Sequence, residues 1–496
     1  MRAIEDFPIT HTAHLPRQLA YNGQRGALAD LEQVYMQQFI RPIVIASALL
    51  AGLSISTKVT QPNRADIPTG LALTELATSL LPPSLASALQ PNTQSTTHPT
   101  TLDANDLVFH EGHQSRADIP IPTIDLPTEV NTHFGTVAGG GAPSYNEIAL
   151  EKNVLYFQRS LSALGLSPTL ANLFFANGDS GEATVRYIDD NNEQQFKVPD
   201  IPDLDGAATY ANTKGWFQAL AQAEKPCPAF FYFTGHGAYN NDNGDDNWLI
   251  LWEEAFVSVK EMAGWLDPLP AEQPFVTMMA QCYSGSFANL IYENGDPEQP
   301  VALQSRCGFF ATVASRPSVG CTPAVNEADY KDYSSSFFAG LTGRDRIGNA
   351  IDSADYNQDG QVSYAEAHAF AKVDEETTDW PISTAEAWLQ RQLSDEAVEA
   401  LLARPIDEWT AIARPEQQYV LRSLSAKLGF DTRLSYSANY SNFQAPEANT
   451  VKEAYHKRLE MELANVAAEK NIRAEQASNE VAVLEKILAC EAGFWQ

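Results

Sequence analysis

The stretch Pro228–Gly237, "PAFFYFTGHG", decides the fold class. Its apolar run is typical of a strand that is buried on both faces of a parallel sheet. The run ends abruptly in Thr-Gly-His-Gly, which places His236 between two glycines at the end of the strand. Functional sites of open α/β sheets form where the carboxyl ends of strands give way to loops. His236 is therefore a candidate functional residue.

Segments typical of strands and helices alternate on both sides of this stretch, from about residue 130 to 345. Apolar runs at 133–141, 173–179, 274–285 and 307–315 predict further strands. Helical spacing predicts helices at 144–165, 215–224, 257–269, 286–293 and 333–341, the first with a capping box formed by Ser144 and Glu147. This alternation predicts an α/β fold with a mostly parallel central sheet, covered on both faces.

Cys282 ends the apolar run "PFVTMMAQCYSG" and follows His236 by 46 residues, which is the length of one crossover with its loops. Adjacent parallel strands would bring both side chains to one edge of the sheet. An imidazole beside a thiol takes or balances its proton and raises the thiolate fraction. Gly235 and Gly237 leave room for a substrate backbone, and the N–H groups of Gly237 and Cys282 are the candidate oxyanion hole.

The two motifs "FTGHG" and "QCYSGSF" resemble those of the cysteine endopeptidases that include caspases, metacaspases, gingipains and legumains. Legumain-like enzymes carry a strand ending in His-Gly, then a strand ending in Cys-x-Ser-Gly-Ser. The matching positions here are His236, Gly237, Cys282, Ser284, Gly285 and Ser286. The resemblance covers roughly residues 130–345 and is nearest to the legumain-like branch.

The resemblance implies a caspase-like αβα sandwich and a cysteine peptidase that works through a thioester acyl-enzyme. Cys282 would be the nucleophile and His236 the acid and base. Gln281 and Ala280 stand where legumains have an alanine and an acidic residue, so the cleavage specificity stays open. A transpeptidase with the same dyad, or an inactive binding or scaffold protein that keeps the fold, are the alternatives.

In this group of enzymes the loop after the fifth strand helps to shape the first specificity pocket. Here that loop offers Ser315 and Arg316 as candidate substrate-binding residues, with the guanidinium suited to an acidic substrate residue. The acidic side chains Glu327, Asp329 and Asp332 suit a basic one instead. Ordinary solvation of a polar surface loop is the third interpretation.

The five cysteines are too widely spaced to indicate a disulfide scaffold or a zinc site. Cys307 and Cys321 bracket part of the loop after the fifth strand. A disulfide between them is expected if the protein is exported, and free buried thiols are the alternative.

The stretch 355–366, "DYNQDGQVSYAE", fits the twelve-residue calcium loop of EF-hands, with Gly360 at the sharp turn. The alternative is an acidic surface loop. Because only one such loop is present, we expect a fixed Ca²⁺ ion rather than a calcium switch. The expected ligands are Asp355, Asn357, Asp359, Gln361 and Glu366.

Composition changes divide the chain into four parts: an N-terminal segment (1–125), a peptidase domain (126–350), an EF-hand-like loop (351–372) and a helical C-terminal region (373–496). The N-terminal segment contains an apolar run at 36–57 and a linker rich in Pro, Ser and Thr. The run fits a signal peptide or membrane anchor, and a buried helix is the alternative. We therefore expect a secreted or periplasmic protein, or otherwise a cytoplasmic one, with the N-terminal segment as an intramolecular propeptide.

Lysine and arginine number 32 against 63 aspartates and glutamates, a formal net charge of −31. This excess argues against nucleic acid as a partner, because nothing offsets the repulsion of phosphates. A polypeptide substrate is the expected partner.

Overall fold

The computed structural model describes residue 116 and residues 119–441, 447–474 and 479–496. The apolar run at 36–57 and the linker that follows it lie outside these residues. All described residues belong to one compact unit, Thr101–Gln496. Within them, no helix is long and apolar enough to cross a membrane.

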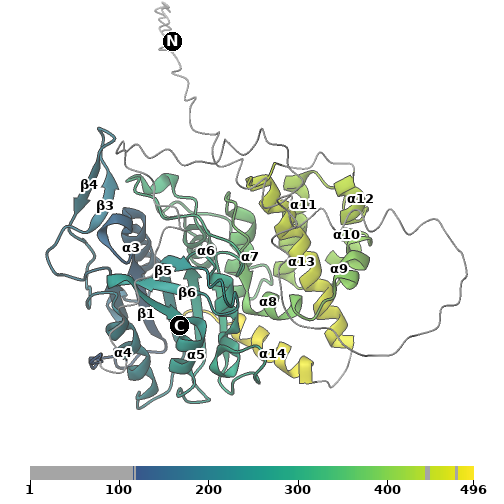
Figure 1. Cartoon of the computed structure of the whole chain (residues 1–496). Coiled ribbons are helices and arrows are strands. Elements are labelled where there is room, and N and C mark those ends of the chain that lie inside the picture. Colours follow the sequence, from purple (N-terminus) through teal and green to yellow (C-terminus); the bar gives the residue numbers. More distant parts are fainter. Residues whose placement is uncertain (1–115, 117–118, 442–446, 475–478) are drawn as a thin grey trace, which may run out of the picture. The chain divides into compact units, whose positions relative to one another are not determined.

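A central, mostly parallel sheet confirms the expected α/β class (Figure 1). Its main path runs β10 (Ile382–Ser383), β9 (Arg306–Phe310), β8 (Phe275–Ala280), β5 (Ala229–Ala238), β1 (His133–Gly139) and β2 (Ala171–Phe175). Every pairing along this path is parallel except that of β10 with β9. Two strands, β6 (Trp248–Leu251) and β7 (Ala255–Ser258), continue from the carboxyl end of β5 as antiparallel neighbours. A separate hairpin joins β3 (Val185–Ile188) to β4 (Gln194–Lys197).

Alternating side chains of β5 explain why its apolar run is unbroken. Phe230 and Tyr232 enter the core on one face of the sheet, and Phe231 and Phe233 enter the core on the other. The first face is covered by α3 (Ile148–Ala163), α6 (Tyr333–Thr342) and α7 (Tyr364–Asp374). The second is covered by α4 (Tyr210–Ala221) and α5 (Val259–Leu266). A strand buried on both faces needs apolar residues at every position.

Two expected helices differ in the structure. The segment at 286–293 forms a 3₁₀ helix, η5 (Ser284–Ile291), rather than an α-helix. Helix α3 begins at Ile148, with Glu147 as its N-cap, so the predicted capping box of Ser144 with Glu147 is wrong. Ser144 instead lies in a short 3₁₀ turn, and the Glu147 side chain is directed elsewhere, as described below.

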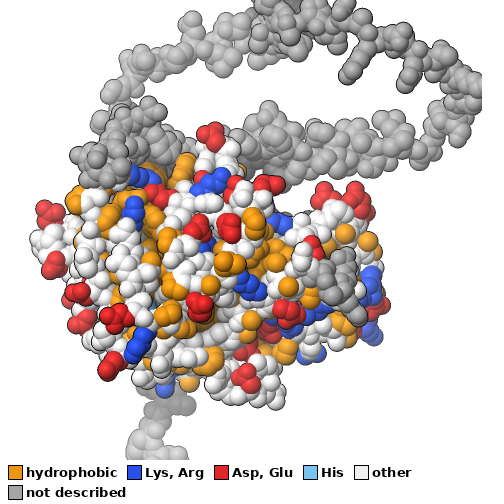
Figure 2. All heavy atoms as spheres, turned by 90° about the horizontal axis from the view of Figure 1, so that it is seen from below, with side chains coloured by type: hydrophobic (Ala, Val, Ile, Leu, Met, Phe, Trp, Pro, Cys, Tyr) orange, Lys and Arg blue, Asp and Glu red, His pale blue; other side chains and the backbone are white. Residues whose placement is uncertain are grey.

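The C-terminal region is helical, as expected. After α7 it comprises α8 (Thr384–Gln390), α9 (Asp395–Leu402), α10 (Ile406–Thr410), α11 (Pro415–Leu428), α12 (Tyr436–Ser441), α13 (Val451–Ala474) and α14 (Asn479–Glu491). Helix α13 buries Leu459 and Leu463 in a core shared with α11. The face in Figure 2 shows carboxylate side chains spread widely among apolar and basic ones, in keeping with the acidic composition.

The last residues of the chain complete the core of the sheet. Trp495 is only 6% exposed and packs edge-on against Phe134 and Phe230, with ring centroids 5.4 and 5.2 Å away.

A disulfide joins Cys307 of β9 to Cys490 of α14. The expected disulfide between Cys307 and Cys321 is therefore wrong, and so is the alternative that both are free buried thiols, because Cys307 is bonded to Cys490 and Cys321 is free but exposed. The C-terminal helices are a structural part of the sheet domain.

We expect the Trp495→Ala variant to lose about 3–5 kcal/mol of unfolding free energy, because a large aromatic side chain leaves a cavity in a closed core. Denaturant unfolding followed by circular dichroism measures this. Leu303→Ala is the control, since Leu303 is 79% exposed and should change stability by less than about 0.5 kcal/mol. Equal stability of the two variants would contradict the packing of Trp495.

Candidate functional site

The parallel register of β5 and β8 brings the two predicted catalytic residues to the same edge of the sheet. Thr234 pairs with Ala280 at the last position of the ladder. His236 lies two residues after Thr234, and Cys282 lies two residues after Ala280, so both lie on neighbouring segments at this edge of the sheet. Although burial raises the pKa of the Cys282 thiol, the charge of His236 acts to lower it.

The glycines around His236 are required by the protein's own backbone. A Cβ atom on Gly237 would lie 2.2 Å from the carbonyl oxygen of Cys282, and one on Gly235 would lie 2.7 Å from that of Gly139. Room for a substrate backbone was the expected reason for both. Here the glycines let the ends of three neighbouring strands approach one another closely.

Glu147 is a site residue that the sequence did not identify. It lies at the start of α3, is 3% exposed, and its Oε2 atom is 3.0 Å from Nε2 of His236. Its other oxygen, Oε1, accepts a hydrogen bond of 2.5 Å from Arg186. Although burial opposes the charge, the bonds from His236 and Arg186 hold the pKa of Glu147 below its usual value. A buried carboxylate thus fixes one side of the imidazole.

Cys321 is a second thiol beside His236. It lies on the loop after β9, is exposed, and its sulfur lies within 4.8 Å of a ring nitrogen of His236. Its sulfur also approaches the carbonyl of Gly235 at 3.8 Å. Burial opposes the charge on His236, but Cys321 and Glu147 together hold its pKa well above the usual value. His236 therefore lies between a carboxylate and a thiol that is not the predicted nucleophile.

The same loop contacts the sulfur of Cys282. The backbone N–H of Ser318 is 3.3 Å from that sulfur, and the Ser318 carbonyl is 3.5 Å from it. Partial burial raises the pKa of the Cys282 thiol to about 11, and Cys321 adds to this, while Ser318 and His236 act against it. In this arrangement the loop shields Cys282, and its thiol is mostly protonated at neutral pH.

Arg316 and Ser315, the predicted substrate-binding residues, lie just before this contact. The guanidinium of Arg316 stacks on Trp380, with its Cζ atom 4.0 Å from the ring centroid. Its carbonyl accepts a hydrogen bond of 2.9 Å from Tyr283 N, next to Cys282. Ser315 is exposed. Both residues thus border the site, with Arg316 held by an aromatic face in the C-terminal region.

Asp379 fastens the loop to the C-terminal region. This carboxylate, 1% exposed, accepts hydrogen bonds from the Ser318 hydroxyl at 2.5 Å and from Val319 N at 3.1 Å. Burial raises the pKa of Asp379. The backbone carbonyl of Asp379 accepts a 2.9 Å bond from the buried guanidinium of Arg458 in α13. The loop beside Cys282 is therefore positioned by residues far outside the predicted peptidase domain.

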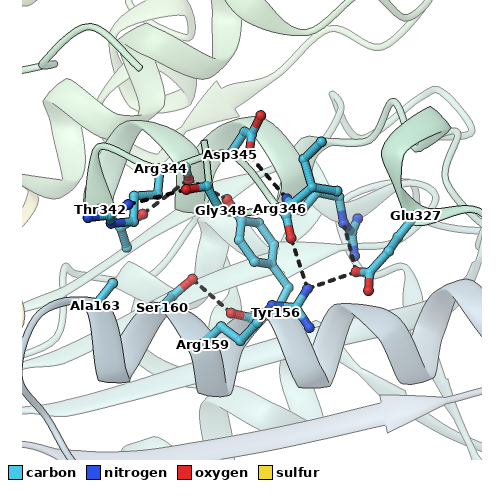
Figure 3. A pocket seen from close by; sticks show the side chains of 11 residues that line it. Tyr156, Arg159, Ser160, Ala163, Glu327, Thr342, Arg344, Asp345, Arg346 and Gly348 are labelled. Atoms are coloured by element: carbon cyan, nitrogen blue, oxygen red, sulfur yellow. Dashed lines mark hydrogen bonds and ion pairs between the residues drawn. The ribbon is translucent and has the colours of Figure 1, made fainter. Parts of the chain in front are cut away.

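The far end of the loop is anchored against α3. Glu327 accepts a 2.7 Å hydrogen bond from Arg159 and lies 3.7 Å from Arg346 (Figure 3). These side chains line a pocket of about 420 Å³ that includes neither His236 nor Cys282. Asp332 caps α6 and lies 3.3 Å from Arg346. Glu327 and Asp332 are thus held by the protein's own arginines.

The EF-hand-like loop forms a compact turn ahead of α7. Asp355 accepts hydrogen bonds from the N–H groups of Asp359 and Gly360, and Gly360 has the positive φ of +91° that the turn requires. Glu366 is 2% exposed and accepts from Tyr356 N and Asn357 N. No entering helix precedes it among the described residues, because α6 ends at Thr342.

The oxygen-bearing side chains of this loop could bind Ca²⁺ only if at least one of them, Glu366, changed its orientation. The carboxylate of Glu366 already accepts hydrogen bonds from backbone N–H groups, including that of Ser363 in the capping box of α7. Among the described residues, the one group of His, Cys, Asp or Glu donors within 4.8 Å of one another is Glu147, His236 and Cys321. Glu366 would have to turn toward Asp355 and Asp359 to complete a calcium shell.

No family model matches the chain, and no curated protein is significantly similar to it. A solved structure, Raptor of Chaetomium thermophilum, matches with a TM-score of 0.26 and 11% identity. The match covers 75% of this chain and 40% of that one.

We expect iodoacetamide, in metal-free buffer at neutral pH, to modify Cys321 about tenfold or more faster than Cys282, because Cys321 is exposed whereas Cys282 is partly buried and its pKa is raised. Peptide mapping by mass spectrometry gives both rates in one sample. The unfolded chain is the control, in which the rates should converge. Faster labelling of Cys282 in the folded protein would contradict the shielded arrangement.

Proposed function

We propose that the protein is a cysteine endopeptidase of the caspase-like and legumain-like kind. The register of β5 with β8 carries this proposal, because it places an imidazole and a thiol at adjacent strand ends. The αβα layering and the order His-then-Cys along the chain support it. Polypeptide is the proposed substrate class.

In the proposed reaction the loop that carries Cys321 first moves away, so that this thiol no longer raises the pKa of His236. The neutral imidazole then takes the thiol proton, and the sulfur of Cys282 attacks the scissile carbonyl. The C–N bond then breaks, and His236 returns the proton to the leaving amine, which leaves a thioester. Water, activated by His236, hydrolyses the thioester and frees Cys282. Glu147 holds the imidazole in orientation and stabilises its protonated form, the role of a third residue in such sites. The N–H groups of Gly237 and Cys282 are proposed to bind the oxyanion.

Substrate binding requires the loop around Ser318 to move. The sulfur of Cys282 contacts this loop on its backbone, and Cys321 occupies one side of His236. A polypeptide that reaches Cys282 must displace both contacts. The structure thus supports a resting form of the proposed enzyme, and the loop that carries Ser315 and Arg316 is proposed to border the bound peptide.

We expect Cys282→Ala to abolish peptide cleavage and any self-processing, and His236→Ala to lower kcat by about 10²–10⁴-fold through loss of acid-base catalysis. Assay of the purified protein against a peptide library, with product masses, measures this. Cys227→Ala, which removes a free thiol just before β5, at the opposite end of that strand from His236, is the matched control and should keep full activity. Cleavage that survives in Cys282→Ala would refute the assignment of the nucleophile.

Two alternatives give different products in the same assay. A transpeptidase would join the acyl group to an added amine, which shifts the product mass. An inactive scaffold would cleave nothing and would not react with a thiol-directed peptide probe at Cys282. The proposed endopeptidase reacts with the probe at Cys282 and releases free carboxylates.

We further propose that the loop at 355–366 binds a structural Ca²⁺ ion, held by Asp355, Asn357, Asp359, the carbonyl of Gln361 and Glu366. The inward turn of Asp355 and the φ of Gly360 support this. The ion would supply positive charge to the carboxylate cluster. Helix α7 packs on α6, so the ion would brace the base of the loop that contacts Cys282.

We expect Ca²⁺ at 100 times its Kd to raise the unfolding free energy by about 2.7 kcal/mol, by linkage of binding to folding. Thermal melts with Ca²⁺ and with a chelator measure the shift. Asp355→Asn should reduce it, whereas Asp352→Asn, an acidic neighbour outside the twelve positions, should not. If chelation changes neither melting temperature nor activity, the loop is an ordinary acidic turn.

Export through an N-terminal signal, followed by masking of the site by the segment 1–125, is a further proposal; of this segment the structure describes only residue 116 and residues 119–125. The disulfide between Cys307 and Cys490 supports it, because such bonds persist mainly in oxidising compartments.

A further inference from the structure

We propose that Glu147, His236 and Cys321 form a binding site for Zn²⁺ or a similar thiophilic divalent ion. Their donor atoms, a carboxylate oxygen, a ring nitrogen and a sulfur, lie within 4.8 Å of one another. They come from three separate elements: the N-cap of α3, the end of β5 and the loop after β9. The fold thus gathers three good metal ligands that are far apart in sequence.

The donor set selects the class of ion. Zinc takes sulfur, nitrogen and oxygen ligands at about 2.0–2.3 Å in tetrahedral geometry, and three protein ligands with one open position are common in its exchangeable sites. In tetrahedral geometry these bond lengths put the ligand atoms about 3.3–3.7 Å apart. Oε2 of Glu147 and Nε2 of His236, now 3.0 Å apart, must separate slightly, and the sulfur of Cys321 must lie within the same range of both. Calcium and magnesium prefer shells made of oxygen, so a thiolate and an imidazole disfavour both.

The surroundings of the three residues favour a bound ion. Arg186 holds Oε1 of Glu147 and leaves Oε2 directed at His236, as outer partners do for carboxylate ligands of metals. Cys321 is exposed and gives the ion a path from solvent. Glu147 is buried, so its carboxylate is not one of the solvated surface acids that gather without a metal.

An ion at this position would hold the imidazole that the proposed reaction needs. Zinc would then inhibit peptide cleavage. This consequence rests on the proposed function, whereas binding of the ion does not. The two are separable with Cys282→Ala, which removes the proposed nucleophile and leaves all three metal ligands in place.

Cobalt titration of the metal-free full chain tests the site, because a Co²⁺–thiolate bond gives a charge-transfer band that carboxylate sites cannot give. We expect one equivalent of Co²⁺ to produce the band, and Zn²⁺ to remove it by competition. Cys321→Ser should abolish it, and Glu147→Gln should weaken affinity by about 10–100-fold. Cys227→Ser, the matched thiol control, and Cys282→Ala should retain it.

A second measurement uses only the wild-type protein, so it does not depend on whether a variant folds. Zn²⁺ should slow alkylation of Cys321 in the wild-type protein by tenfold or more and leave Cys227 unchanged, as read by peptide mapping. Absence of the cobalt band in the wild type, survival of the band in folded Cys321→Ser, or alkylation of Cys321 that ignores Zn²⁺ would each overturn the proposal. A Cys282→Ala protein that lacks peptidase activity but keeps the band supports the metal site on its own.

Discussion

The parallel pairing of β5 with β8 is the constraint on which the site depends. The register pairs Thr234 of β5 with Ala280 of β8, and so places His236 and Cys282, two residues further along, at the same edge of the sheet. The two backbone segments remain close beyond the last paired residues. Position 237 must be glycine, because a Cβ atom there would collide with the carbonyl oxygen of Cys282. A slip of β5 by one residue against β8 would turn His236 to the other face of the sheet, away from Cys282.

Much of this arrangement was predictable because its signals are local. An apolar run that ends in Thr-Gly-His-Gly indicates a buried strand and its carboxyl end, and the separation of His236 from Cys282 indicates one crossover. Strand positions, the parallel sheet and the helical C-terminal region were confirmed on that basis. The ligand pattern of the calcium loop is equally local, and its occupancy remains a prediction.

The rest could not be predicted, because it depends on contacts between residues far apart in sequence. The sequence pattern indicated that Glu147 closes a capping box with Ser144. No local signal indicates that its carboxylate contacts His236, 89 residues later. Cys321 looked like a partner for Cys307 because the two are near in sequence, yet Cys490 is the partner, 183 residues away. Trp495 carried no signal at all, since its core position exists only once the C-terminal helices pack.

These distant contacts converge on one loop, and this links the C-terminal helices to the site. Arg458 binds the carbonyl of Asp379, whose carboxylate binds Ser318, whose backbone contacts the sulfur of Cys282. Each step is a hydrogen bond between buried or half-buried groups, and an unpaired buried partner is costly. The loop therefore cannot leave Cys282 without new partners for the polar groups it abandons. In the proposed peptidase, a bound peptide backbone would supply donors and acceptors to replace them, so the contact that shields the thiol would also favour an extended polypeptide.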